Sequence, residues 1–169
     1  RHLEGRFKED FVEGSWTAPP KLLPALGREF VLRTVRGRQF GQFREESRKT
    51  FFAGAYRVTP QSDRMGYRLD GPSLALADSK ELLSEAVNFG TVQVPPDGKP
   101  IVLMADRQTT GGYPMIGQVI SVDLPLLAQA KPGDFLRFRE ISLREAQSLY
   151  LLREKEIRRF REGIAIRFK

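Results

Sequence analysis

The side chains best suited to chemistry lie in one segment, residues 104–116, which reads MADRQTTGGYPMI. It holds a carboxylate, a guanidinium, an amide and two hydroxyls between apolar runs at 101–105 and 119–122 that are typical of buried strands. Its Gly-Gly pair would let another group approach the backbone N–H groups closely. Backbone amides and hydroxyls presented together are typical of sites for an anion or an amide. A solvated glycine turn has the same composition, so this segment alone does not decide between the two.

Two other polar segments also lie at junctions between a predicted strand and a turn. Residues 58–71 contain a Pro-containing turn between two β-type runs, which predicts a hairpin. Residues 90–98 contain a short strand with Val92 and Val94 on one face and Gln93 on the other, followed by a Pro-Pro-Asp-Gly turn. Rigid strands can aim the polar side chains of such junctions at a common point. We therefore predict one pocket built from all three segments.

The predicted pocket would bind an anionic group and a small amide, such as a urea or a lactam. Arg64 would clamp the anionic group, and Asp106, the only carboxylate within 104–116, is the candidate general base. The substrate-binding candidates are Gln93, Gln108, Thr109, Thr110, Gly111, Gly112, Tyr113 and Tyr67. The glutamines would bind the amide, the threonines would donate to an oxyanion, and the glycines would leave room for the substrate. No metal site is expected.

Each candidate also has a purely structural interpretation. Arg64 and Arg107 could form surface ion pairs, for example with Asp63 or Asp106, and such pairs contribute little. The glutamines could bridge loop backbone, the threonines could end strands, and the tyrosines could belong to the core. The sequence leaves these alternatives open.

The composition bounds the class of protein. A chain of 169 residues supports one ordinary domain. It has no cysteine, which excludes disulfides, thiolate catalysis and cysteine zinc sites and fits a cytoplasmic protein. Its single histidine is His2, which argues against a Ser-His-Asp triad and a multi-histidine metal site. No apolar run approaches the roughly 18 residues of a membrane span, so no membrane association is expected.

The net charge of +7 is concentrated at the C-terminal end. Residues 135–169 hold ten Lys and Arg against five Asp and Glu, whereas the other 134 residues hold 18 against 16. The basic residues alternate with glutamates in a helical context, which is typical of a solvated or partner-facing helix. They lack the interleaved aromatic residues of single-strand-binding surfaces, so no nucleic-acid partner is expected.

Short strands with few helices predict a mainly β domain, either a closed barrel or a sandwich. Residues 1–28 are interpreted as a linker or the remnant of a preceding domain, and 29–141 as the β domain. Strands are expected at 29–35, 55–59, 65–69, 91–95, 101–105, 116–122 and 135–139, and helices at 42–52 and 79–87.

Residues 142–169 are expected to form a helix and a terminal strand. Ser142 and Glu145 have the spacing of a capping box, which predicts a helix from about residue 143. Gly163 suits the position just after the helix. Three alternating apolar residues then predict a strand that needs a partner: Ile164, Ile166 and Phe168.

Several of these segments together resemble one known family. The matching residues are SDRMGYRL at 62–69, LLSE at 82–85, GTVQVP at 90–95, ADRQTTGGYP at 105–114, DL at 123–124 and PGD at 132–134. From about Phe30 onward the chain resembles the C-terminal half of the family of 5-oxoprolinase C subunits. This family is also labelled allophanate hydrolase subunit 2, KipI antagonist and biotin-dependent carboxyltransferase.

The resemblance implies a cyclophilin-like β-barrel with a short helix and a C-terminal helix. Two such barrels make the full-length C subunit, and this chain would carry the second. The implied partners are the B subunit of 5-oxoprolinase, which is KipI-like, and the N-terminal barrel of the same family. If the active site lies between the two barrels, this chain holds half of it.

The resemblance favours an ATP-dependent 5-oxoprolinase that opens 5-oxoproline to glutamate. The alternative is a carboxyltransferase domain that moves CO2 from carboxybiotin to urea or a related amide. A third interpretation is a non-catalytic module that antagonises a kinase inhibitor. No covalently bound cofactor is expected: ATP would act through the complex, and no methionine precedes a lysine, so biotin would arrive on a separate carrier.

Overall fold

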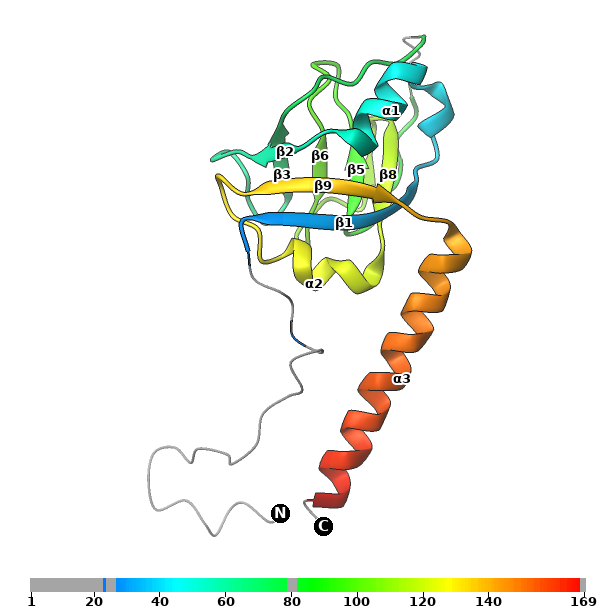
Figure 1. Ribbon diagram of the computed structural model, residues 1–169. Helices are drawn as coiled ribbons and strands as arrows, with labels where there is room; N and C mark the ends of the chain where they lie inside the picture. Colours follow the sequence, from blue (N-terminus) through cyan, green and yellow to red (C-terminus); the bar gives the residue numbers. More distant parts are fainter. Residues whose placement is uncertain (1–22, 24–26, 79–81, 168–169) are drawn as a thin grey trace.

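Seven strands close into a barrel (Figure 1). The computed structural model describes residues 23, 27–78 and 82–167. Around the barrel the strands follow the order β1, β8, β5, β6, β3, β2, β9. Their bounds are β1 Glu29–Arg36, β2 Tyr56–Val58, β3 Gly66–Asp70, β5 Thr91–Gln93, β6 Ile101–Leu103, β8 Met115–Val119 and β9 Phe135–Glu140. The predicted mainly β barrel is confirmed, including the β2–β3 hairpin.

The barrel closes where β1 and β9 pair in parallel. Phe30 lies opposite Leu136 and Leu32 opposite Phe138, and all four side chains are buried. The intervening residues of both strands point outward, which is the period of two expected for a sheet with one buried face. The other barrel strands pair antiparallel.

Short helices cover the ends of the barrel. The helices η2 (Phe40–Gln42) and α1 (Glu45–Ala53) replace the single helix expected at 42–52. α1 places Phe51 against Phe138 with ring centroids 4.6 Å apart, which extends the core beyond the strands. The helices η3 (Ser121–Asp123) and α2 (Leu124–Leu127) follow β8, so the strand predicted at 116–122 ends earlier than expected.

The C-terminal helix α3 spans Leu143–Arg167 and extends away from the barrel (Figure 1). The predicted capping box is confirmed: Glu145 N donates to Ser142 Oγ over 3.2 Å, and Ser142 N donates to Glu145 Oε2 over 2.8 Å. The predicted helix end at Gly163 and the predicted strand after it are wrong, because residues 163–167 are helical. A closed barrel offers a short apolar alternation no free edge to pair with, whereas the helix supplies its backbone bonds locally. Phe168 lies outside the described residues.

The helix predicted at 79–87 is also wrong over its described part. Residues 82–84 are irregular, and β4 (Glu85–Ala86) pairs with β7 (Thr110–Gly111) in a separate two-stranded sheet. Backbone pairing with β7 therefore overrides the weak apolar stripe of this segment. Most of the predicted linker at 1–28 lies outside the described residues. Within the described part of the chain no helix is long and apolar enough to cross a membrane.

Candidate functional site

The two-stranded β4–β7 sheet, called the ribbon below, holds the 104–116 segment beside the barrel. Glu85 pairs with Gly111 and Ala86 with Thr110, and Val87 N donates to Thr109 O over 3.0 Å. Two further bonds anchor the ribbon: Gln39 Nε2 donates to Glu85 over 3.2 Å, and Val94 N donates to Pro114 O over 3.0 Å. The ribbon therefore forms a wall that faces strands β3, β6 and β5.

A pocket of about 510 Å³ lies between the ribbon and those strands. It brings together residues from all three polar segments of the sequence. Six of the predicted substrate-binding residues line it: Gln93, Gln108, Thr110, Gly111, Gly112 and Tyr113. Met65, Val87, Ile101 and Leu103 add apolar surface, and Asp63, Arg68 and Arg107 add charge.

Four predicted site residues do not line this pocket. Thr109 contributes its carbonyl to the ribbon. Tyr67 is half-buried and packs against the barrel core, and this burial raises the pKa of its phenol. For these two residues the structural interpretation fits better than the functional one. The other two, Arg64 and Asp106, pair with each other.

The Arg64–Asp106 pair is bidentate and exposed. Arg64 Nε lies 2.6 Å from Asp106 Oδ2 and Nη2 lies 3.2 Å from Oδ1, with side-chain exposures of 81% and 51%. The hydrogen bond from Arg64 holds the pKa of Asp106 below its usual range. A carboxylate with a lowered pKa is a weaker base, so this geometry favours a surface ion pair over a general base.

Arg68 and Arg107 are the cations that face the pocket. Within the described residues neither guanidinium has a carboxylate partner, and Arg107 donates only to the Val87 and Ala105 carbonyls over 3.4 Å each. Guanidinium groups without a counter-charge can hold a carboxylate or a phosphate. Alternation along β3 puts Arg68 on the face opposite the buried Leu69, so the sequence pattern indicates the orientation of Arg68 but not its role.

Gln93 is the most constrained polar side chain of the pocket, with only 4% of the residue exposed. Its amide donates from Nε2 to Tyr113 O over 3.1 Å. A carbonyl only accepts hydrogen bonds, so nitrogen must face Tyr113 and Oε1 remains as an acceptor. Gly111 packs directly on this amide, since a Cβ there would lie 2.5 Å from Nε2. The Gly-Gly pair thus makes room for Gln93 as well as for a ligand.

The Asp63 carboxylate shapes the loop at the edge of the pocket. Its Oδ1 accepts from Met65 N over 2.8 Å and from Gly66 N over 3.0 Å. These bonds turn the chain into β3 and leave Asp63 with a structural task. Among the described residues no group of three or more Asp, Glu, His or Cys side chains could hold a metal ion. The pocket is therefore equipped to bind an anion and an N–H donor.

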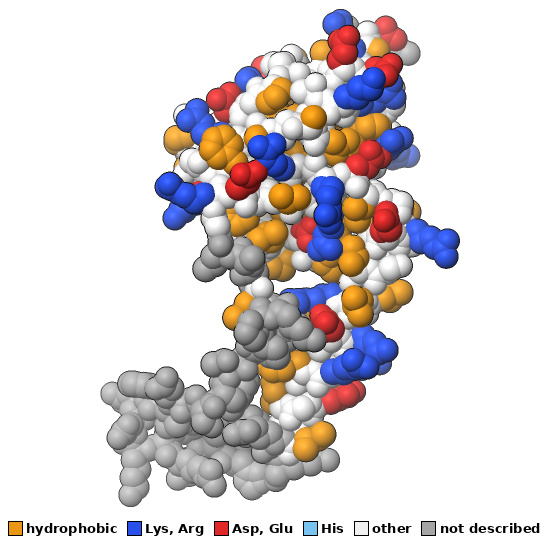
Figure 2. Space-filling view, in the orientation of Figure 1, with side chains coloured by type: hydrophobic (Ala, Val, Ile, Leu, Met, Phe, Trp, Pro, Cys, Tyr) orange, Lys and Arg blue, Asp and Glu red, His pale blue; other side chains and the backbone are white. Residues whose placement is uncertain are grey.

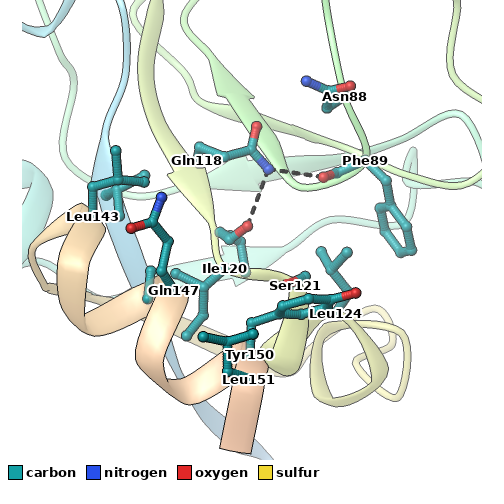
Figure 3. A pocket seen from close by; sticks show the side chains of 13 residues that line it. Asn88, Phe89, Gln118, Ile120, Ser121, Leu124, Leu143, Gln147, Tyr150 and Leu151 are labelled. Carbon is teal, nitrogen blue, oxygen red and sulfur yellow. Dashed lines mark hydrogen bonds between the residues drawn. The ribbon is translucent and has the colours of Figure 1, made fainter. Parts of the chain in front are cut away.

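A second hollow, of about 580 Å³, lies where the start of α3 meets the barrel (Figure 3). Among the described residues, no charged side chain lines it. The side-chain amide of Gln118 lies at its centre and is hydrogen-bonded at both ends. Nε2 donates to Phe89 O and Val119 O, and Oε1 accepts from Thr91 Oγ1. This hollow is suited to packing rather than chemistry.

Comparisons with known proteins agree with this fold. Residues 4–140 match the family described as "Carboxyltransferase domain, subdomain A and B". A 5-oxoprolinase C subunit from Haemophilus influenzae is 45% identical over 119 residues, which are 70% of this chain and 38% of that protein. The corresponding Escherichia coli protein is 44% identical over 115 residues, or 68% of this chain and 37% of its own length.

Among solved structures, the K. lactis urea amidolyase superposes with a TM-score of 0.78 at 26% identity, over 85% of this chain and 9% of that one. The chain spans less than two fifths of the bacterial relatives that it matches. The family match covers most of the chain, including every strand of the barrel. The protein therefore belongs to the family of carboxyltransferase domains with subdomains A and B.

Proposed function

We propose that this chain is the substrate-binding part of a 5-oxoprolinase C subunit and helps to open 5-oxoproline to glutamate with ATP. The observation that carries the proposal is the pocket itself, which combines Arg68 and Arg107 with the fixed Oε1 of Gln93. 5-Oxoproline has one carboxylate and one lactam N–H. The arginines would hold the carboxylate and Gln93 would accept the N–H. The 44–45% identity to two 5-oxoprolinase C subunits supports the same substrate.

The role proposed for this chain is binding and orientation. The one carboxylate that lines the described pocket is Asp63, whose Oδ1 already accepts two backbone N–H groups, and Asp106 pairs with Arg64 outside the pocket. The groups that activate the lactam, together with ATP, would then come from companions. We propose the KipI-like B subunit of 5-oxoprolinase and the N-terminal barrel of the C subunit itself as those companions.

The alternative function is a carboxyltransferase domain that uses carboxybiotin on a separate carrier and urea or a related amide. It is favoured by the family description and by the similarity to a urea amidolyase. Carboxybiotin also carries a carboxylate beside a ureido N–H, so the same three residues would bind it. The two functions differ in which molecule binds when each is offered separately.

The test is isothermal titration of the complex reconstituted with its companions. 5-Oxoproline should bind, while 2-pyrrolidinone, which lacks the carboxylate, should bind at least roughly tenfold more weakly because a charge-assisted contact is worth about 1.5–3 kcal/mol. Arg68→Gln and Arg107→Gln should each weaken 5-oxoproline by about fivefold to tenfold, discounted for partial exposure. Arg57→Gln, an exposed arginine on β2 paired with Asp70, is the matched control and should change nothing.

Arg64→Gln decides between the two assignments of the anion clamp. Unchanged affinity of Arg64→Gln for 5-oxoproline would assign the carboxylate to Arg68 and Arg107. A loss of affinity as large as in the Arg68 and Arg107 variants would assign the carboxylate to Arg64 instead. Binding of biotin in place of 5-oxoproline would favour the carboxyltransferase. Wild-type affinity for 5-oxoproline in both pocket variants would contradict the proposed site.

A further inference from the structure

The start of α3 forms one side of an apolar groove, called the α3 groove (Figure 3). Helix residues Leu143, Tyr150 and Leu151 face Phe89, Ile120 and Leu124 of the barrel side across a volume of about 580 Å³. All three helix side chains are exposed. Exposed apolar side chains gathered in a hollow are typical of a protein-binding surface.

The polar side chain at the floor of the groove, Gln118, already has its hydrogen-bond partners within the chain. Gln118 is held by three hydrogen bonds of 2.7–3.0 Å to Thr91, Phe89 and Val119. The polar rim is different, since Gln147 has no hydrogen bond with another described residue and points into the groove (Figure 3). The groove would therefore take large apolar side chains in its centre and polar backbone at its rim.

The same face of α3 becomes basic beyond the groove. Helical neighbours recur every three or four residues, so the face that holds Tyr150 and Leu151 continues through Ile157, Arg158 and Arg161. Glu154 lies on the same face, so this stretch carries two arginines against one glutamate. Arg158 and Arg161 are exposed. Figure 2 shows Lys and Arg side chains beside hydrophobic ones along this helix. The opposite face carries Leu152 and Arg159, which are also exposed but do not line the groove.

α3 has 25 residues and a length of about 38 Å, and among the described elements its main contact is with η3, made by its first turns. Helices in proteins are stabilised mainly by packing of an apolar face rather than by intrinsic propensity. The helix holds seven Lys and Arg against four Glu. With a chain charge of +7, a second copy would meet the same positive surface, whereas an acidic partner would be attracted.

We propose that the α3 groove and the basic stretch beyond it bind an acidic amphipathic helix of a partner protein. Two large apolar side chains of that helix fill the groove, and carboxylates near its other end pair with Arg158 and Arg161. This surface is separate from the pocket at the ribbon, with which it shares no lining residue, so the inference does not rest on the proposed function.

The probe is a pair of synthetic 20-residue helical peptides with the same leucine stripe, one flanked by glutamates and the other by lysines. Fluorescence anisotropy with the full chain should show the acidic peptide binding at least roughly tenfold more tightly than the basic one. Leu151→Ser and the double variant Arg158→Gln with Arg161→Gln should each weaken the acidic peptide by about fivefold or more.

The matched controls are Leu152→Ser and Arg159→Gln, which make the same chemical changes on the opposite face of the helix. They should leave the affinity within about twofold, and circular dichroism should show equal helix content in all variants. Equal binding of the two peptides, no binding of either, or equal losses on both faces would overturn the proposal. Sedimentation showing a dimer of the free chain that Leu151→Ser abolishes would assign the surface to a second copy instead.

Discussion

Replacing Gly111 by alanine tests whether the ribbon fixes Gln93 where the pocket needs it. A Cβ atom at Gly111 would lie 2.5 Å from Gln93 Nε2 and 3.0 Å from Oε1. Gln93 is 4% exposed and its amide is bonded to Tyr113 O. The new methyl group must therefore push the amide toward the pocket, which breaks the bond to Tyr113 O, or displace the ribbon.

The cost of this change is set by one buried hydrogen bond, about 1–3 kcal/mol. Any glycine-to-alanine change at an unstrained position also stabilises by about 0.4–1 kcal/mol, because it restricts the unfolded chain. Gly112→Ala is the matched control, since its Cβ would approach no described atom closer than Ser84 Oγ at 3.5 Å. Both variants gain the same stability from the restricted unfolded chain. The difference between their free energies of unfolding therefore measures the contact with Gln93.

We expect Gly111→Ala to be less stable than Gly112→Ala by about 1–3 kcal/mol in urea denaturation. For a chain of this size the melting temperatures should differ by roughly 2–12 °C. Gly111→Ala should also lose affinity for the pocket ligand, whereas Gly112→Ala keeps it unless the methyl group meets the ligand. Equal stability of the two variants would refute the conclusion that close contact with Gly111 holds Gln93 in place.

Two further predictions concern the ion pair and the long helix. Arg64→Gln should raise the pKa of Asp106 toward its usual value, because the hydrogen bond from Arg64 is what lowers it, and carboxyl NMR titration would measure the change. In the wild type this lowered pKa contributes stability above the unfolded pKa of about 3.9, and the contribution is lost as pH falls through the lower folded value; an unchanged Asp106 titration in the variant would contradict the pairing. Gly163→Ala should stabilise the protein by about 0.5–1 kcal/mol, because Gly163 lies inside α3 and an added Cβ would contact no described atom. Thermal denaturation would measure it, and a destabilised variant would show that Gly163 ends the helix instead.

The strands of the barrel could be predicted because each carries its own local signal. Phe30 and Leu32 alternate with exposed residues on β1, and the turn between β2 and β3 contains Pro60 followed by polar residues. The start of α3 was equally predictable, since Ser142 and Glu145 bond to each other's backbone. These features depend only on residues that are neighbours in sequence.

The errors come from choices that distant residues decide. Residues 82–87 hold an apolar stripe that fits a helix, but Glu85 and Ala86 pair with β7, about 25 residues later. Ile164 and Ile166 alternate like a strand, yet the barrel closes through β1 and β9 and offers them no edge. The sequence pattern of a segment does not show whether another strand has a free edge with which the segment can pair.

The site shows the same limit at the level of single side chains. Composition favoured Arg64 and Asp106, and the fold joins them to each other at the surface. Arg68 and Arg107 have the same charge, but they line the pocket and have no carboxylate partner among the described residues. Which arginine has a counter-charge depends on contacts across 42 positions of sequence, as for Arg64 and Asp106, and no spacing rule contains that information.

The side chains of the pocket are suited to orienting a substrate rather than to delivering a proton or an activated group to it. Opening a lactam and transferring a carboxyl group both require that an amide be oriented and that a proton or an activated group be delivered to it. Arg68, Arg107 and Gln93 can orient the ligand. Asp63 is the one carboxylate that lines the described pocket, and its Oδ1 accepts two backbone N–H groups. Under either proposed function, we expect a companion to make that delivery. Turnover should therefore depend on that companion, while binding of the isolated ligand should depend on these three residues.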